Sequence, residues 1–219
     1  MEGTVIRPVQ RPAPLRQSVY DALIDLIVSG RLPPGQHLVE TDIARQLGVS
    51  RQPIREALHR MEAEGWVDLR PSQGAFVHVP TDSEVDELLD VRELLEAETA
   101  RCAARHADAE GVARLRVICA EGAAAAEADD VSRAVEANNA YHAEVAALAG
   151  NAVLADLASI VSRRVQWYYW LVAPARKRGS WAEHIEQIQA IEAGDEQRAG
   201  ELAREHTKHT RSAYHNASK

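Results

Sequence analysis

The stretch Leu47–Leu58 reads Leu-Gly-Val-Ser-Arg-Gln-Pro-Ile-Arg-Glu-Ala-Leu, and it predicts the end of one helix, a very short turn and the start of another. Gly48 suits the left-handed position that closes a helix. Ser50 suits the N-cap of the next helix, and Pro53 falls in its first turn, where a missing N–H costs little. Two helices joined by so short a turn are typical of a helix-turn-helix.

The helix that begins after Ser50 has two different faces. Its apolar residues recur at helical spacing and predict a buried stripe of Ile54, Ala57, Leu58 and Met61. The opposite face places Arg51 and Arg55 one turn apart, with Gln52 beside them. An arginine can donate to both O6 and N7 of guanine, and a glutamine can read a base edge, so this face suits the major groove of DNA. A solvated charged face with no partner is the alternative.

The flanking sequence completes a small domain over residues 15–79. An amphipathic helix precedes the stretch and ends at Gly30, and a short helix is predicted from Thr41 to Leu47. After it, two runs that alternate with period two flank a turn at residues 71–74 and predict a β-hairpin. This order is that of a winged helix-turn-helix. We expect Ser50 to help hold a phosphate, and Gln73 and Gly74 at the hairpin tip to approach DNA closely.

Charge and composition are compatible with this interpretation. The chain has 219 residues with 25 Lys or Arg and 33 Asp or Glu, a formal charge of −8. Residues 1–79 contain nine of each sign, so the acidity belongs to residues 80–219 and does not exclude a DNA partner.

Cys102 and Cys119 predict buried thiols, not a disulfide framework. Without an apolar run of ~18 residues or a secretion signal, we expect a cytoplasmic protein with no membrane partner.

The remaining segments predict a mainly α protein. Residues 1–14 contain three prolines and no apolar period, which predicts a flexible arm. Residues 80–219 predict an all-helical bundle, because capping residues and glycines recur between long amphipathic runs. Its six expected helices lie near 82–107, 109–127, 131–149, 152–172, 181–193 and 196–214.

Polar residues interrupt stripes that otherwise read as core in this bundle. They are Asn138 and His142 on one helix, His184 on another and His206 on a third. A single residue of this kind is more often a core histidine with a satisfied hydrogen bond. Three histidines and an amide are harder to explain in that way, because buried polar atoms need partners and these four could share one cation. Imidazole nitrogens suit zinc, nickel or another borderline divalent metal.

Two further features have open interpretations. Arg92 falls on an inward stripe of the first bundle helix, where it forms an ion pair with Glu96 or binds an anionic ligand. The aromatic run Trp167–Trp170 belongs to the helix core, or else to a pocket wall or a dimer contact.

Residues 15–79 resemble the GntR family of bacterial transcription regulators. The resemblance rests on the stretch from Leu47 to Leu58, together with Gly35–Leu38, Glu64–Val67 and Gly74–Val77. It implies that Arg51, Gln52 and Arg55 touch operator bases or phosphates and that Gly74 lies against DNA. Thr41 stands where some members have an arginine, so we rank it below the two arginines and expect a different operator.

Residues 81–219 resemble, more loosely, the C-terminal FCD ligand-binding domain of the FadR-type branch of that family, in its shorter, six-helix, VanR-like form. The resemblance rests on Asn138 four residues before His142 and on His184 and His206, 22 residues apart. It implies a divalent metal on these four residues, with Arg92 near an effector carboxylate. Members more commonly have aspartate where this chain has Asn138, which removes one negative charge from the site.

We therefore expect a DNA-binding transcription regulator, more specifically a repressor, that binds operator DNA as a homodimer. A small carboxylate metabolite bound near the metal is expected to control it. One alternative is a regulator without metal that binds an acyl group directly. Another is a histidine-metal hydrolase. The sequence has no carboxylate at a characteristic spacing from the histidines that could act as a base, so we expect no enzyme.

Overall fold

The computed structural model describes residues 15–217, with side chains except those of 168–175 and 177–178. It divides the chain into two units, which meet in the sequence between Val79 and Pro80. The arm expected at residues 1–14 lies outside the described residues, as do the side chains of residues 168–170 in the aromatic run.

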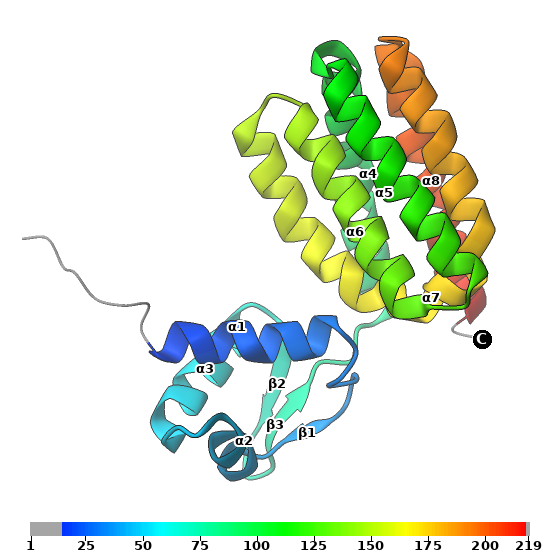
Figure 1. Ribbon diagram of the computed structural model, residues 1–219. Coiled ribbons are helices and arrows are strands. Elements are labelled where there is room, and N and C mark those ends of the chain that lie inside the picture. The colour runs from blue at the N-terminus through cyan, green and yellow to red at the C-terminus, as the bar shows by residue number, and fades with distance from the viewer. Residues whose placement is uncertain (1–14, 218–219) are drawn as a thin grey trace, which may run out of the picture. The chain divides into compact units, whose positions relative to one another are not determined.

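The N-terminal unit is a winged helix-turn-helix (Figure 1). Its described helices are α1 (Leu15–Val28), α2 (Glu40–Leu47) and α3 (Arg51–Ala63). Its described strands are β1 (His37–Leu38), β2 (Val67–Arg70) and β3 (Gly74–Val77), which form an antiparallel sheet in the order β1-β3-β2. The predicted hairpin is therefore not alone, because β1 adds a third strand. Two residues are too short a segment to show a period, which is why the sequence did not reveal it.

The turn between α2 and α3 forms as its residues require. Gly48 adopts a left-handed φ of 65° and caps α2, and Ser50 occupies the N-cap position of α3 without a side-chain capping bond. The predicted inner stripe of α3 is buried in full and consists of Ile54, Ala57, Leu58 and Met61. It packs against α1, so the opposite face of α3 remains exposed.

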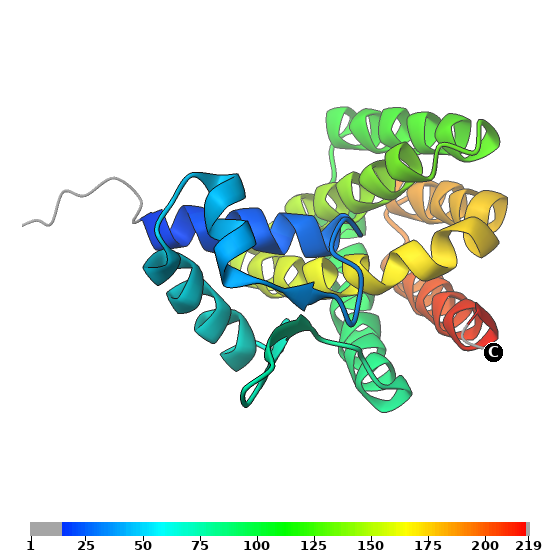
Figure 2. The ribbon, with the colours of Figure 1, turned by 90° about the horizontal axis from the view of Figure 1, so that it is seen from below.

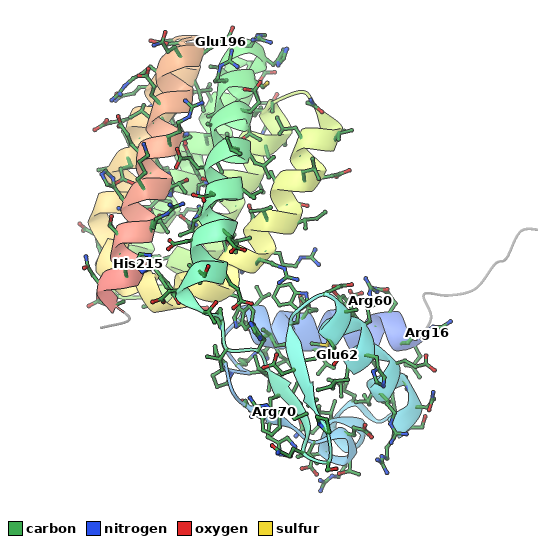
Figure 3. All side chains as sticks on the ribbon, turned by 180° about the vertical axis from the view of Figure 1, so that it is seen from behind. Arg16, Arg60, Glu62, Arg70, Glu196 and His215 are labelled. Carbon is green, nitrogen blue, oxygen red and sulfur yellow. The ribbon has the colours of Figure 1, made fainter. Side chains whose placement is uncertain are left out.

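The described part of the C-terminal unit consists of helices and short connections, with no strand. Its helices are α4 (Asp82–His106), α5 (Ala109–Glu127), α6 (Val131–Leu148), α7 (Ala152–Glu192) and α8 (Glu196–Ala217). Glu196 and His215, at opposite ends of α8, are labelled in Figure 3. Thr81 and Glu84 form a capping box at the start of α4. The fold class predicted from the sequence, mainly α with a small wing, is confirmed. None of the described helices is both long and apolar enough to cross a membrane.

The prediction of separate helices over 152–172 and 181–193 is wrong, because the backbone is helical from Ala152 to Glu192. Ser180, expected to cap a new helix, lies inside α7 and is buried. The helix nevertheless changes direction, and its two ends take separate places in the bundle (Figures 1 and 2). Pro174 lies within it, and an interior proline bends a helix because it lacks an N–H and crowds the preceding turn.

The core of this unit is built from α4, α5, α6, the end of α7 and α8. Its fully buried side chains include Leu115, Tyr141 and Ile188. Both cysteines are reduced and buried, as predicted. Trp167, the one member of the aromatic run whose side chain is described, is also buried, which fits the helix-core interpretation.

Gly122→Ala is expected to lower the free energy of unfolding of this unit by about 3 kcal/mol, because overpacking a core typically costs 1–3 kcal/mol and occasionally more. A Cβ at Gly122 would overlap the buried indole of Trp181. The melting temperature, followed by circular dichroism, should fall by roughly 6–12 °C.

Gly179→Ala is the matched control, since a Cβ at Gly179 meets no atom of the described side chains within 4 Å and the residue lies in α7. It should raise stability by up to about 1 kcal/mol. Equal melting temperatures for the two variants would contradict the packing of α5 against α7.

Candidate functional site

The exposed face of α3 presents two arginines side by side. The side chains of Arg51 and Arg55 are 56% and 49% exposed, and both lie on the face opposite the buried stripe. Glu40, the first residue of α2, contacts both of them. Arg51 donates from Nε and Nη2 to Glu40 Oε2 at 3.3 and 2.8 Å. Arg55 donates from Nε to Oε1 at 3.1 Å and from Nη2 to Oε2 at 3.0 Å.

Glu40 was not among the residues expected from the sequence. It lies 11 and 15 residues before its two partners, and nothing in the local pattern links them. The hydrogen bonds from Arg55 and Arg51 lower the pKa of the Glu40 carboxyl to about 2. The carboxylate therefore stays ionised at any physiological pH, and three charged groups share this face.

A groove of about 450 Å³ runs between this face and the wing, which we define as β2, the following turn and β3. Its lining brings together four of the residues expected to meet DNA or to lie near it, namely Thr41, Arg51, Arg55 and Gly74. Ser50, Gln52 and Gln73 are exposed but do not line it. Gln52 donates to Glu56 at 2.9 Å instead.

The wing has a structural reason for its glycine. Gly74 has φ +96°, and a Cβ there would stand 2.9 Å from Nε2 of His37. The His37 ring stacks on Phe76 at 4.6 Å between centroids, and the Arg70 guanidinium covers the same ring at 4.3 Å. Arg70 and His37 both line the groove, and sequence reasoning missed them. Arg70, labelled in Figure 3, adds a third cation there.

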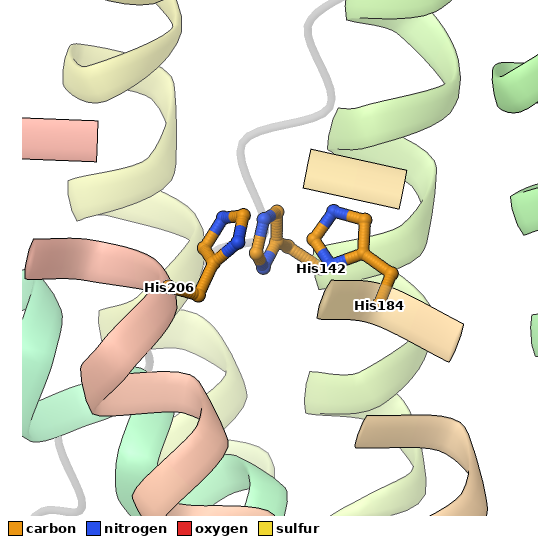
Figure 4. Close-up of side chains that lie close together, drawn as sticks. All are labelled: His142, His184 and His206. Atoms are coloured by element: carbon orange, nitrogen blue, oxygen red, sulfur yellow. The ribbon is translucent and has the colours of Figure 1, made fainter. Parts of the chain in front are cut away.

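The three predicted histidines converge in the C-terminal unit, one each from α6, α7 and α8 (Figure 4). One ring nitrogen of each of His142, His184 and His206 lies within 4.8 Å of those of the other two. Oδ1 of Asn138 lies 3.2 Å from Nε2 of His184. Two ligand atoms on one cation about 2.1 Å away stand about 3–3.5 Å apart, so this pair already has a suitable separation.

Burial keeps these histidines neutral. Desolvation lowers the pKa of His142 to about 4, against the opposing effect of Glu96. Burial likewise places the pKa of His184 and of His206 well below the ordinary value. A neutral imidazole has a lone pair on one nitrogen, which is the form that binds a metal.

His206 is oriented by a carboxylate. Its Nδ1 lies 2.8 Å from Oε2 of Glu183, and because a carboxylate only accepts, Nδ1 carries the proton. The other nitrogen, Nε2, therefore has a lone pair, and it is buried without a hydrogen-bond partner among the described residues. An unsatisfied buried acceptor that faces two more imidazoles fits a metal ligand.

The sequence pattern alone did not point to Glu183 as part of the site. Glu183 also accepts from Arg176 at 3.1 and 2.5 Å and from Nδ1 of His209 at 2.7 Å. The one sequence feature that links Glu183 to the cluster is its position directly before His184 on α7. Its hydrogen-bond partners lie on an earlier turn of α7 and on α8. The carboxylate thus links the cluster to the exposed His209.

Arg92 lies beside the cluster as well as in an ion pair. It donates from Nε to Glu96 at 2.7 Å, and its Nη2 lies 3.2 Å from Nε2 of His142. Its Nη1 is buried and has no hydrogen-bond partner in the part of the chain that the structure describes. The ion-pair interpretation of Arg92 therefore matches the geometry, and one donor remains for another acceptor.

The space next to the cluster is small. A cavity of about 10 Å³ borders Thr99, His142, Ser162 and His206. Such a volume admits a water molecule or an ion but no organic molecule.

Comparisons with known proteins identify both units. Residues 15–77 match the family described as "Bacterial regulatory proteins, gntR family", and residues 87–209 match the FCD domain. The Nta operon transcriptional regulator of Aminobacter aminovorans is 28% identical over 73% of this chain and 75% of its own length. A protein of Paenarthrobacter nicotinovorans, named "Probable D-xylose utilization operon transcriptional repressor", is 31% identical over 81% of this chain and 78% of its own.

Solved structures share the fold. E. coli McbR/YncC has a TM-score of 0.81 with 21% identity over 95% of this chain and all of its own. A GntR regulator from Rhodococcus sp. RHA1 has a TM-score of 0.80 with 23% identity over 94% and 99%. The relatives named here are transcription regulators and not enzymes, which removes the hydrolase alternative. The chain therefore belongs to the GntR family of bacterial transcription regulators, with an FCD domain C-terminal to its DNA-binding unit.

Proposed function

We propose that the chain is a cytoplasmic repressor that binds a two-fold operator as a homodimer. A small organic acid, bound beside a divalent metal ion in the C-terminal unit, releases it from DNA. The observation that carries the DNA-binding part is the pair Arg51 and Arg55 on one exposed face beside the wing groove. A repressor in particular is supported by the name of the Paenarthrobacter nicotinovorans relative.

In this proposal α3 enters the major groove. Arg51 and Arg55 contact base edges, with Gln52 beside them, while Ser50 and Thr41 lie nearer the backbone. The wing, with Gln73 and Gly74 at its tip, lies along the neighbouring phosphates, where Arg70 supplies a positive charge.

A homodimer is supported by an apolar stripe on α7. Val153, Leu157 and Ile160 recur at helical spacing and are 70%, 49% and 63% exposed. A stripe of this kind on a soluble protein marks an interaction surface. A second copy is the partner that two operator half-sites require, because a two-fold axis then relates both protein and DNA.

The metal part of the proposal assigns Asn138, His142, His184 and His206 as ligands. Three imidazoles and one amide oxygen suit zinc, with nickel or a similar borderline ion as the alternative. The unsatisfied Nε2 of His206 is the observation that supports a cation here. A bound divalent ion would supply a positive centre that attracts a carboxylate.

The effector in this proposal is a small carboxylate. Its negative charge would satisfy the buried Nη1 of Arg92, which has no partner among the described residues. Because the cavity holds only about 10 Å³, the first part of α7, which contributes Ala158 and Ser162 to its wall, has to move when an acid enters. Movement of this kind gives the effector a different affinity for two states, which is what a ligand needs in order to shift DNA binding.

A regulator without metal is the second candidate. It is favoured by the hydrogen bonds that His142 and His184 make with Arg92 and Asn138, since these partly satisfy the cluster with no ion. In this case the effector's acyl group occupies the cavity without a metal, and the first part of α7 has to move here too.

A thermal-shift screen of small mono- and dicarboxylic acids tests the proposal. We expect one class of acid to raise the melting temperature of the full-length protein by several degrees in the presence of zinc, because a ligand that binds only the folded state stabilises it. A chelator should abolish that shift. The same acid should release the protein from its operator in a gel-shift assay.

The outcomes separate the two candidates. An equal shift with and without chelator would support the metal-free regulator. If no acid shifts the melting temperature under either condition, the carboxylate effector is wrong.

A further inference from the structure

We propose that Glu40 is a positioning residue that fixes which edge of Arg51 and of Arg55 meets DNA, and that it thereby sets sequence specificity. The inference rests on the proposed role of the two arginines as DNA readers. Neither the sequence motifs nor the comparisons assign a role to Glu40.

The hydrogen bonds bind both guanidinium groups by the same edge. In Arg51 and in Arg55 alike, Nε and Nη2 donate to the Glu40 carboxylate, at distances between 2.8 and 3.3 Å. A guanidinium has five N–H groups in a planar fork, so two are used and three remain. The three that remain belong to Nη1 and to the outer side of Nη2, at the tip of the side chain.

The free tip is the edge that reads guanine. A bidentate contact to O6 and N7 needs two N–H groups that point the same way, and the Nη1 and Nη2 pair supplies them. Glu40 holds the side edges of both arginines and therefore directs both tips away from itself. Because the side chains are already ordered before DNA arrives, less conformational entropy is lost on binding.

The same carboxylate weakens binding to random DNA. Two arginines beside one glutamate have a combined charge of +1 where they would otherwise have +2. Affinity for DNA of any sequence depends on the number of phosphates that cations neutralise, so Glu40 lowers that affinity. Better order for base contacts and weaker attraction to phosphates act in the same direction, toward a higher ratio of specific to non-specific affinity.

A purely structural role for Glu40 makes a different prediction. Glu40 lies in the first turn of α2, where a negative charge is favourable near the helix N-terminus. Asp42 lies in that same turn, but its ion pair is with Arg45 and it does not line the groove. If Glu40 acted only through its charge or its helix, Asp42 would be its equal.

The experiment compares Glu40→Gln with Asp42→Asn in the full-length protein. A random-sequence duplex pool first yields the sequence that the wild type enriches. The equilibrium dissociation constant is then measured for that duplex and for a base-scrambled duplex of equal length, at several salt concentrations. Glu40→Asp is added because it keeps the charge but shortens the reach to the two arginines, and thermal melts verify that each variant is folded.

We expect Glu40→Gln to lower the specificity ratio about tenfold, roughly the loss of one good base contact. Its salt dependence on scrambled DNA should steepen by about one unit, because one more cation is free to neutralise a phosphate. Glu40→Asp should lower the ratio without changing the salt dependence. Asp42→Asn should leave the ratio within about twofold of the wild type.

Equal ratios for Glu40→Gln and Asp42→Asn would overturn the inference, as would a wild-type ratio for Glu40→Asp. Failure of the underlying DNA assignment is recognised separately, because Arg51→Ala and Arg55→Ala would then bind the enriched duplex as the wild type does.

Discussion

Replacing Arg51 and Arg55 together by alanine is expected to lower operator affinity by roughly two to four orders of magnitude. Each bidentate arginine–guanine contact contributes about 1–3 kcal/mol to discrimination between bases, and the double variant removes two such groups. Affinity for scrambled DNA should fall much less, because only the phosphate attraction of two cations is lost. Gel-shift titration or fluorescence anisotropy on both duplexes measures the effect.

The fold should tolerate this double substitution. Both side chains are about half exposed, and surface ion pairs contribute little to stability, so the melting temperature should change by no more than a few degrees. The matched control is Arg114→Ala with Arg116→Ala, an exposed arginine pair on α5 in the other unit. Operator binding equal to that of this control would refute the assignment of α3 as the reading helix.

Replacing His184 by alanine is expected to abolish metal retention, with a loss of affinity greater than about 100-fold. Removing a residue that only orients a ligand typically costs 10–100-fold, and losing a ligand should cost more. Metal content after dialysis against trace zinc, and the rise in melting temperature on adding zinc, both report the site. The wild type should hold one equivalent per chain.

Two further variants make this metal prediction decisive even if His184→Ala is unstable. His215→Ala removes a partly buried histidine outside the cluster that pairs with Asp86 at 3.0 Å, and it should retain the metal. Asn138→Asp adds a negative charge where the amide oxygen now lies beside His184, so it should bind zinc more tightly than the wild type. Wild-type protein without any zinc-dependent change in melting temperature would count against the metal site.

Much of the DNA-contacting face was predictable because it depends on local rules. An α-helix has 3.6 residues per turn, so Arg51 and Arg55 lie on one side of the helix once Ile54 and Leu58 lie on the other. This step requires no knowledge of the tertiary structure. The inward position of His184 and His206 followed from the same spacing. That the three histidines face each other did not, because it depends on how α6, α7 and α8 pack.

The predicted break in α7 is wrong because the prediction relied on local signals alone. Pro174 and Gly179 are ordinary signals for the end of a helix, and Ser180 resembled the cap of the next one. The structure bends the helix and keeps it unbroken, with Ser180 buried inside it. Packing against α4, α5, α6 and α8 outweighs local propensities, which are worth only about 1–3 kcal/mol per residue.

By itself, the sequence determined the winged helix-turn-helix, the family, the direction of the two arginines and the inward stripes of the histidines, because short periods and capping signals are written in neighbouring residues. Only the tertiary structure decided that Glu40 holds both arginines, that Glu183 orients His206 and that Nη1 of Arg92 has no hydrogen-bond partner among the described residues. These features depend on side chains from different helices or from different turns of one helix. A hydrogen bond requires its two atoms to be close in space, and the spacing of residues along one helix does not predict the distance to another helix.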